Sequence, residues 1–366
     1  MKRTASLAAG VAAANAAGTA GARAASAPIG TPIKPEDLVI AFGHVGPISD
    51  EGWTWTHHKG LQAVQKAYPA ARILEVESLP FSSQASRIIT QFVQSGANLV
   101  FITSGYGDFL YDVAKKYPDV AFMECGRNPV LPNVLGYYIK HWESSYLLGM
   151  AAGLLSKSGK LGYIGSFPLA SVFTDANSFH LGATSVNPEI QTQVLMINSW
   201  FDPQAATQAA NSLFDAGCDV LYGIMDEPAY LKVAQSRGKW AIMWNTDMRR
   251  FGPDAYVSSM MLDWDDFYLG QVKARVEGTW SANKDGILLP VGAGTDRDAW
   301  GSKVPEDVAA KVDDVRKKII GGFNPLVGPI TDSSGSVRIP AGQAMDDITL
   351  YKGWDWTVKG VSGLAS

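Results

Sequence analysis

The chain has 366 residues, with 31 lysines and arginines against 35 aspartates and glutamates. This mildly acidic balance, without a basic run, argues against a nucleic-acid partner and against binding to an anionic membrane surface. About 340 residues remain after the leader described next, which is more than one hydrophobic core usually supports, so two lobes are expected.

The first residues have the composition of a targeting segment. Lys2 and Arg3 form a basic start, an alanine-rich stretch without acids follows, and Ala22-Arg23-Ala24 is a small-x-small cleavage site. We therefore predict a secretory signal peptide over residues 1–24; an organellar transit peptide fits less well because arginine is sparse there. No cysteine follows the cleavage site, so a lipid anchor is not expected. No later stretch approaches the roughly 20 uninterrupted apolar residues of a membrane span.

Short apolar runs alternate with helical stretches along the rest of the chain. Strands are predicted at 38–46, 71–78, 97–105, 120–125, 160–166, 191–197, 219–225, 240–246 and 257–262. Helices are predicted near 53–68, 82–95, 107–117, 142–156, 171–186, 203–217, 227–237 and 265–277. This alternation predicts an α/β fold of βαβ units with parallel sheets and right-handed crossovers.

The pattern restarts near 138–142, which indicates two similar modules. We expect an N-terminal lobe of residues 36–140 plus about 258–290, and a C-terminal lobe of residues 141–257 plus about 291–366. Two such lobes joined by several chain crossings form a hinged clamp. Residues 328–336 resemble an exposed hairpin or loop, and Cys125 and Cys218 are interpreted as buried thiols because each lies at the edge of a different strand.

Acidic and aromatic residues recur just after the predicted strands. In an open α/β sheet, ligands bind in the crevice beyond the carboxyl ends of the strands, so these residues are the candidates for one cleft. They are Asp50, Trp53, His57, Tyr106, Asp108, Phe173, Trp200, Asp226, Glu227, Asp247, Asp263 and Trp264, and Asn245 ends a strand in the same way.

Several of these candidates have structural alternatives. Trp53 and Trp264 could pack a helix or a lobe. Of Trp200 and Phe201, one should pack inward and the other should face the cleft. His57 lies one helical turn after Trp53, where it could bond a ligand or only support packing. His58 is expected to be exposed to solvent.

Aspartates also favour helix N-caps, which applies to Asp108, Asp202, Asp226 and Asp247. The cap is the better interpretation for Asp202, because Pro203 follows at the first helical position. For Asp226 and Asp247 ligand binding and capping remain equally open.

The chain lacks the motifs of common enzymes. It has no Gly-x-Ser-x-Gly elbow, no His-Glu-x-x-His and no Walker A loop. It also lacks the cysteine and histidine spacing of a metal site, so neither a metal nor a cofactor is expected. Adjacent acids such as Asp226 and Glu227 cannot be assigned acid and base roles without geometry. We therefore expect a binding protein, not an enzyme.

The chain resembles the basic membrane protein (PnrA-like) family of substrate-binding proteins of ABC importers over nearly its whole mature length. The motifs that carry the resemblance are DEGWTWTHH (50–58), TSGYGDFLYDVAKKYPDV (103–120), GYIGSFP (162–168), ANSFHLGA (176–183), NSWFDP (198–203), DAGCDVLYGIMDEPA (215–229), NTDM (245–248), GPITDSSGSVRIPAG (328–342) and WDWTVKGV (354–361).

This resemblance implies a type I periplasmic-binding-protein fold, with two Rossmann-like lobes joined by three crossovers. It implies a purine nucleoside or nucleobase held between aromatic rings, with Trp53 and Trp200 in the places of those rings and Asp108 in the place of a loop aspartate. It further implies a periplasmic location and a partner, an ABC permease in the inner membrane. A monomer is expected.

Two stretches depart from the nucleoside binders. Those proteins have a glycine-rich stretch where this chain has Met225-Asp226-Glu227-Pro228, and they tend to have a lysine where it has Met260, Met261 and Leu262. The departures favour a free purine base such as adenine, with Asp226 accepting hydrogen bonds from its N–H groups.

Three other functions remain open. A sugar receptor of the same fold would also stack its ligand on tryptophan, usually amid more polar side chains. A secreted nucleoside-processing enzyme would need clustered acids for a metal. A sensing receptor domain would need a membrane span or a DNA-binding segment.

Overall fold

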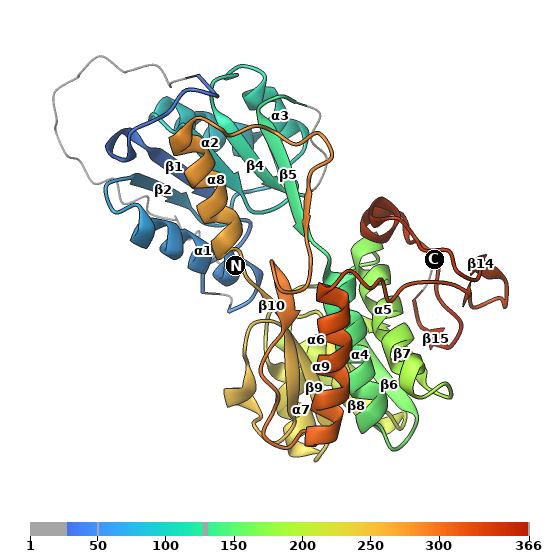
Figure 1. The fold of residues 1–366 in the computed structure, drawn as a ribbon. Helices are drawn as coiled ribbons and strands as arrows, with labels where there is room; N and C mark the ends of the chain where they lie inside the picture. The colour runs from blue at the N-terminus through green and yellow to red at the C-terminus, as the bar shows by residue number, and fades with distance from the viewer. Residues whose placement is uncertain (1–27, 50, 127–130, 365–366) are drawn as a thin grey trace, which may run out of the picture.

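The computed structural model describes residues 28–49, 51–126 and 131–364. The predicted signal peptide and Asp50 lie outside these residues. Within them, the strands form a six-stranded sheet, a seven-stranded sheet and a two-stranded sheet. The two large sheets belong to separate lobes that are linked by crossing segments of chain (Figure 1).

The N-terminal lobe is built on the six-stranded sheet. Its strand order is β11-β5-β4-β3-β1-β2, and every pair is parallel. The strands are β1 (Val39–Gly43), β2 (Arg72–Val76), β3 (Leu99–Ile102), β4 (Ala121–Cys125), β5 (Val134–Ile139) and β11 (Ile287–Leu289). The helices are α1 (Trp53–Ala67), α2 (Ser83–Gln94), α3 (Asp108–Ala114) and α8 (Asp265–Glu277), and η1 (Pro35–Asp37) is a 3-10 turn. Helix α8 returns from late in the chain to pack beside α1 (Figure 1).

The C-terminal lobe is built on the seven-stranded sheet, in the order β12-β10-β9-β8-β6-β7-β15. Only β12 runs antiparallel to its neighbour among the described pairs of this sheet. The strands are β6 (Lys160–Gly165), β7 (Gln191–Met196), β8 (Val220–Gly223), β9 (Trp240–Asn245), β10 (Tyr256–Leu262), β12 (Thr295–Arg297) and β15 (Val361–Ser362). The helices are α4 (His141–Leu155), α5 (Ala170–Val186), α6 (Pro203–Asp215), α7 (Ala229–Ser236) and α9 (Glu306–Ile320).

Smaller elements complete this lobe. The 3-10 turn η2 (Arg249–Phe251) follows β9, and β13 (Ile330–Thr331) pairs with β14 (Val337–Ile339) as a hairpin, as predicted for residues 328–336. A short π-helical segment, η3 (Thr349–Gly353), lies against α5 near the end of the chain.

The described chain passes between the two large sheets after β5, after β10 and after β11, which are the three crossovers expected. The second crossing follows Leu262, because β10 pairs with β9 in the seven-stranded sheet. The lobe boundary predicted between residues 257 and 258 falls inside β10. From the sequence alone, this strand could have joined either of the two sheets. The remaining lobe boundaries stay predictions.

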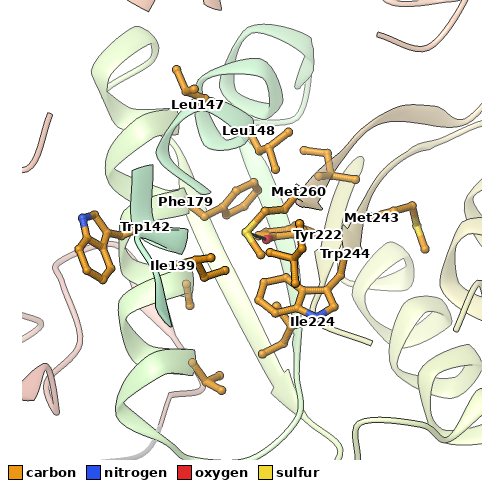
Figure 2. Packing of buried hydrophobic residues seen from close by; sticks show 14 of the residues in the cluster. Ile139, Trp142, Leu147, Leu148, Phe179, Tyr222, Ile224, Met243, Trp244 and Met260 are labelled. Carbon is orange, nitrogen blue, oxygen red and sulfur yellow. Dashed lines mark hydrogen bonds between the residues drawn. The ribbon is translucent and has the colours of Figure 1, made fainter. Parts of the chain in front are cut away.

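The core of the C-terminal lobe is a face of the seven-stranded sheet covered by α4 and α5. Figure 2 shows Phe179 beside Tyr222, with ring centroids 5.2 Å apart, and the Tyr222 hydroxyl 3.9 Å from the sulfur of Met260. Helix α4 is buried almost all round because α5, α9 and the sheet each cover part of it.

Helices α4 and α5 touch backbone to backbone. A Cβ at Gly149 would lie 1.9 Å from the carbonyl oxygen of Phe179, and a Cβ at Gly182 would lie 1.9 Å from that of Tyr146. Only glycine fits at these two points, so the close approach of the helices depends on them.

Every strand predicted from the sequence is present, within a few residues of its predicted bounds. Strands β5, β11, β12 and β15 and helix α9 were not predicted. Asp202 caps α6 as expected, because its Oδ1 accepts from the backbone N–H groups of Gln204 and Ala205. Both cysteines are buried free thiols, and burial raises the pKa of Cys218 to about 11. Among the described residues, no helix has both the length and the apolar character needed to cross a membrane.

We predict that Gly182→Ala destabilises the protein by about 3 kcal/mol, because the added methyl group meets backbone that cannot move aside. Gly270→Ala is the matched control. Gly270 lies in α8, where an added Cβ would have no other atom within 4 Å, so alanine should stabilise by up to about 1 kcal/mol. Urea unfolding followed by circular dichroism measures both changes, and equal stability of the two variants would contradict the tight α4–α5 contact.

Candidate functional site

The side chain of Asp226 joins the two lobes. Asp226 follows β8 in the C-terminal lobe, and its Oδ1 accepts a hydrogen bond of 3.2 Å from the backbone N–H of Trp53, the first residue of α1 in the N-terminal lobe. Gly52 makes room for this contact, since a Cβ there would lie 2.3 Å from Asp226 Oδ1. A carboxylate at a helix N-terminus also complements the positive end of the helix dipole.

Asp226 is itself held by two further hydrogen bonds. Its backbone N–H donates to the carbonyl oxygen of Trp200 over 2.9 Å, and Asn245 Nδ2 donates to its Oδ1 over 2.8 Å. Asn245 is fully buried at the end of β9, with a left-handed φ of 67°. Trp53 and Trp200 are therefore each one hydrogen bond from Asp226, so the structure brings these three predicted residues together.

Both tryptophans are partly buried, and each packs against other rings. Trp53 Nε1 donates to the carbonyl oxygen of Thr103 over 2.8 Å, and its ring lies 5.9 Å from that of Tyr138, between centroids. Trp200 lies 6.0 Å from Phe167 in the C-terminal lobe. Phe201, the neighbour of Trp200, is 59% exposed, so Trp200 is the inward-facing member of the pair.

Two more contacts cross between the lobes beside Asp226. Thr246 Oγ1 donates to the backbone carbonyl of Glu51 over 2.5 Å, and Arg250 forms an ion pair with the Glu51 carboxylate. Together with the Asp226–Trp53 hydrogen bond, they fasten the loop before α1 to the loops after β8 and β9. The lobes thus meet at the edge where the strands of both sheets end.

His57 and Trp264 lie inside the N-terminal lobe. Their rings stack with centroids 4.4 Å apart and planes 13° apart, and His57 Nδ1 is 2.5 Å from the hydroxyl of Tyr268. Burial lowers the pKa of His57, and the charge of His44 acts in the same direction. For His57 and Trp264 the sequence left ligand binding and packing open. The observed contacts are those of packing between α1 and α8.

Tyr106 and Phe173 are also interior residues. Tyr106 is 4% exposed, its hydroxyl donates to the carbonyl oxygen of Leu79 over 2.5 Å, and its backbone N–H donates to the buried carboxylate of Glu124. Phe173 is 5% exposed within the core of the C-terminal lobe. The aromatic residue in the 103–108 loop thus anchors the loop to its own lobe.

Among the remaining acidic candidates, Asp247, Asp263 and Glu227 make local hydrogen bonds. Asp247 accepts from the backbone N–H and the side chain of Arg249, and Asp263 accepts from the backbone N–H of Asp265. Asp108 is exposed in the first turn of α3. Glu227 is 2% exposed and accepts from the backbone N–H of Ala229, and burial raises its pKa.

Sequence reasoning missed two aromatic residues that extend the cluster of rings around Trp53. Tyr138, whose ring contacts that of Trp53, lies near the end of β5. Its ring is also 4.7 Å from that of Tyr351, which η3 brings from near the end of the chain. Their separation in sequence hides the pairing, and Tyr138 lies in a strand that was not predicted.

A separate cavity of about 320 Å³ lies on the hinge side of the lobes. Its walls come from both lobes and include Thr56, Asp263, Trp264, Thr295 and Arg316. Trp53, Trp200 and Asp226 do not line it. It lies where the second and third crossovers run side by side, so hinge motion would change its volume.

Comparison with known sequences identifies relatives along most of the chain. The family described as ABC transporter substrate-binding protein PnrA-like matches residues 38–289. A purine-binding protein of Brucella abortus (strain 2308) is 35% identical over 329 residues, covering 89% of this chain and 93% of the relative. A putative ABC transporter glucose-binding protein of Haloferax volcanii is 33% identical, covering 80% of this chain and 74% of the relative.

Solved structures share the same architecture. An ABC transporter solute-binding protein from Conexibacter woesei superimposes with a TM-score of 0.65 at 24% identity, covering 78% of this chain and 97% of that one. An ABC transporter solute-binding protein from Aeropyrum pernix K1 gives a TM-score of 0.67 at 16% identity, covering 86% and 95%. These likenesses confirm the predicted type I periplasmic-binding-protein fold.

We predict that the double variant Thr246→Val, Arg250→Ala opens the unliganded protein. It removes one hydrogen bond and one ion pair between the lobes, together about 1–2 kcal/mol, which shifts the balance of closed and open forms about tenfold. Small-angle X-ray scattering should record a larger radius of gyration. Thr207→Val, Arg237→Ala removes contacts of the same kinds within one lobe and serves as the control; identical scattering from both double variants would refute a role in closure.

Proposed function

Because the chain belongs to the PnrA-like family of ABC transporter substrate-binding proteins, we propose that it binds a purine base between its lobes and delivers it to a membrane permease. The observation that carries the choice of ligand is the similarity to the purine-binding protein of Brucella abortus, which extends over nearly the whole of both chains. We further propose that the protein is exported by its N-terminal signal peptide, works in the periplasm as a monomer and releases its ligand chemically unchanged.

The neighbourhood of Asp226 supports a flat ligand. Trp53 and Trp200 belong to different lobes, and their backbones are linked through Asp226. Under this proposal, a planar heterocycle that enters between the lobes beside Asp226 stacks on the two indoles. Stacking on an aromatic side chain contributes about 1–3 kcal/mol per base in nucleic-acid binders. Tyr138 lies close to Trp53 and would extend the aromatic wall on the N-terminal side.

Asp226 would supply specificity through its carboxylate. A ligand that donates ring or exocyclic N–H groups would gain charge-assisted hydrogen bonds, which are about twice as strong as neutral ones. A ligand without such donors would leave the carboxylate desolvated and poorly paired, at a cost of about 1–3 kcal/mol or more. Asn245 fixes the orientation of the carboxylate by donating to the same oxygen that faces Trp53.

Residues 260–262, which stand where nucleoside binders tend to have a lysine, support a free base as the ligand. Met260 is fully buried against Tyr222, so its side chain offers no polar contact to a ribose. Leu262 is also buried. The residues at the place where nucleoside binders tend to have a lysine are thus apolar here, which favours a ligand without a sugar.

A sugar is the second candidate ligand, because the Haloferax volcanii relative bears the name of a putative glucose-binding protein. Sugars also stack on indoles. A purine base donates N–H groups to the Asp226 carboxylate, whereas a sugar donates hydroxyl groups. Measuring the affinities of both ligands therefore separates the two candidates.

We predict that Trp53→Ala and Trp200→Ala each weaken adenine binding at least about tenfold, as loss of one stacking surface implies. Trp55→Ala and Phe201→Ala are the matched controls. Trp55 lies in the same helix and packs on His58, and Phe201 is the exposed neighbour of Trp200. Isothermal titration calorimetry gives the affinities, and circular dichroism checks that each variant is folded. Unchanged adenine affinity in both Trp53→Ala and Trp200→Ala would place the ligand elsewhere.

We also predict the order of ligand affinities: adenine binds more tightly than adenosine, and both bind more tightly than glucose. Apolar Met260 and Leu262 give no partner to the ribose hydroxyls, which would lose their water on closure. Calorimetric titration of the three compounds tests the order, and mass spectrometry of the co-purifying ligand gives an independent check. A preference for adenosine would reject the free-base interpretation, and a preference for glucose would reject the purine.

A further inference from the structure

Two histidines and a glutamate converge at the carboxyl ends of β1 and β2, away from Asp226. His44 follows β1, Glu75 lies in β2 and His58 lies in α1. His44 Nε2 is 2.8 Å from Glu75 Oε1, and His58 Nδ1 is 2.7 Å from the same oxygen. One ligand atom from each of the three side chains lies within 4.8 Å of the others.

The cluster reaches from the lobe interior to its surface, because His44 is fully buried while His58 is half-buried and Glu75 lies at the surface. Its other ring nitrogen, Nδ1, finds no hydrogen-bond partner among the described residues, so the polar interactions of this ring are directed at Glu75. His58 and Glu75 are only 14% and 27% exposed at their side chains, so His58 is not the solvent-exposed residue expected from the sequence.

Glu75 is poised to carry its negative charge. Burial alone would raise the pKa of Glu75, but the hydrogen bonds from His44 and His58 outweigh it and hold that pKa below its usual value. The geometry is the main observation: one carboxylate oxygen lies within 2.8 Å of a nitrogen of each imidazole, which groups three metal-ligand atoms.

From this geometry we propose that His44, His58 and Glu75 bind a divalent transition-metal ion, Zn²⁺ in the first instance. Two imidazoles and one carboxylate are a common zinc donor set, with solvent as the fourth ligand. Zinc–nitrogen bonds are about 2.0–2.1 Å long, so tetrahedral donors lie a little over 3 Å apart. The two nitrogen–oxygen separations of 2.8 and 2.7 Å would widen by about half an ångström, and the two ring nitrogens, which lie within 4.8 Å of each other, would take up the same spacing. The ion would replace the two imidazole protons that now point at Oε1.

Gln62 could hydrogen-bond the ring nitrogen of His58 that does not bind the ion. Its side-chain amide lies 3.1 Å from His58 Nε2, the nitrogen that stays free when Nδ1 binds the ion. Metal-bound imidazoles donate their second N–H to a neighbouring acceptor, and rotation of the Gln62 amide presents its oxygen for this. The ion would tie α1, the helix that Trp53 opens, to the edge of the sheet.

The test is a zinc titration of the full chain after treatment with a chelator. We expect one equivalent of Zn²⁺ to bind with a dissociation constant of about 1 µM or tighter, measured by competition with a chromophoric chelator. Co²⁺ in its place should give the intense visible absorption of a tetrahedral site. His58→Ala and Glu75→Gln should each weaken zinc binding about 100-fold, since removing even an outer partner costs up to that factor.

Glu77→Gln is the matched control, because Glu77 follows two residues later on the same side of the extended chain and bonds Ile48 instead. It should retain the zinc affinity, and zinc should raise its Tm as in the unaltered protein but not that of His58→Ala. Zinc binding that is unaffected by both His58→Ala and Glu75→Gln, or that needs about millimolar zinc, would overturn the proposal. The titration contains no purine, so its outcome is independent of the proposed function.

Discussion

The hydrogen bond between the Asp226 carboxylate and the first backbone N–H of α1 is the contact around which the site is arranged. It links the C-terminal end of one sheet to the N-terminal end of a helix in the other lobe, and it brings Trp53 and Trp200 into the same neighbourhood. Its geometry depends on Gly52, because any side chain there would occupy the position of the carboxylate. The sequence Gly52-Trp53 therefore has two roles: glycine admits the partner from the opposite lobe, and tryptophan presents a large apolar surface beside it.

This contact is useful for closure only because each lobe is rigid on either side of it. In the C-terminal lobe, α4 and α5 approach until Gly149 and Gly182 leave no space for a methyl group. In the N-terminal lobe, His57 and Trp264 fill the contact between α1 and α8, so the helix that carries Trp53 cannot shift without breaking a stacked pair. The contacts of Glu51 with Thr246 and Arg250 are polar links between the lobes that an opening motion at the crossovers would break.

The alternation of strands and helices was readable from the sequence because both sheets are mainly parallel and their strands are almost continuous apolar runs. Strand β5 was not predicted because the alternating pattern restarts directly after it. The predicted lobe boundary fell inside β10 because the local sequence does not show which strand β10 pairs with. The rule of strand ends selected Trp53, Trp200 and Asp226, which are linked by the hydrogen bonds of Asp226, and it also selected Tyr106 and Trp264, which are buried within the N-terminal lobe. Position along a strand does not reveal which way a side chain turns. The grouping of His44, His58 and Glu75 was equally hidden, since three separate elements contribute one residue each and no spacing motif results.

The chemistry around Asp226 explains why a ligand could both bind and drive closure. A carboxylate has about four acceptor positions, and Asp226 Oδ1 already accepts from Trp53 N–H and Asn245 Nδ2. Those two donors fix the plane of the carboxylate, and Asn245 does so from a buried left-handed conformation that the fold must hold in place. Closing the lobes removes water from this charge, which is costly unless N–H donors of the ligand replace the lost water. Under the proposed function, a base that stacks on the indoles and donates to Asp226 would offset that cost only in the closed form. Its binding energy would then be available to hold the two lobes together.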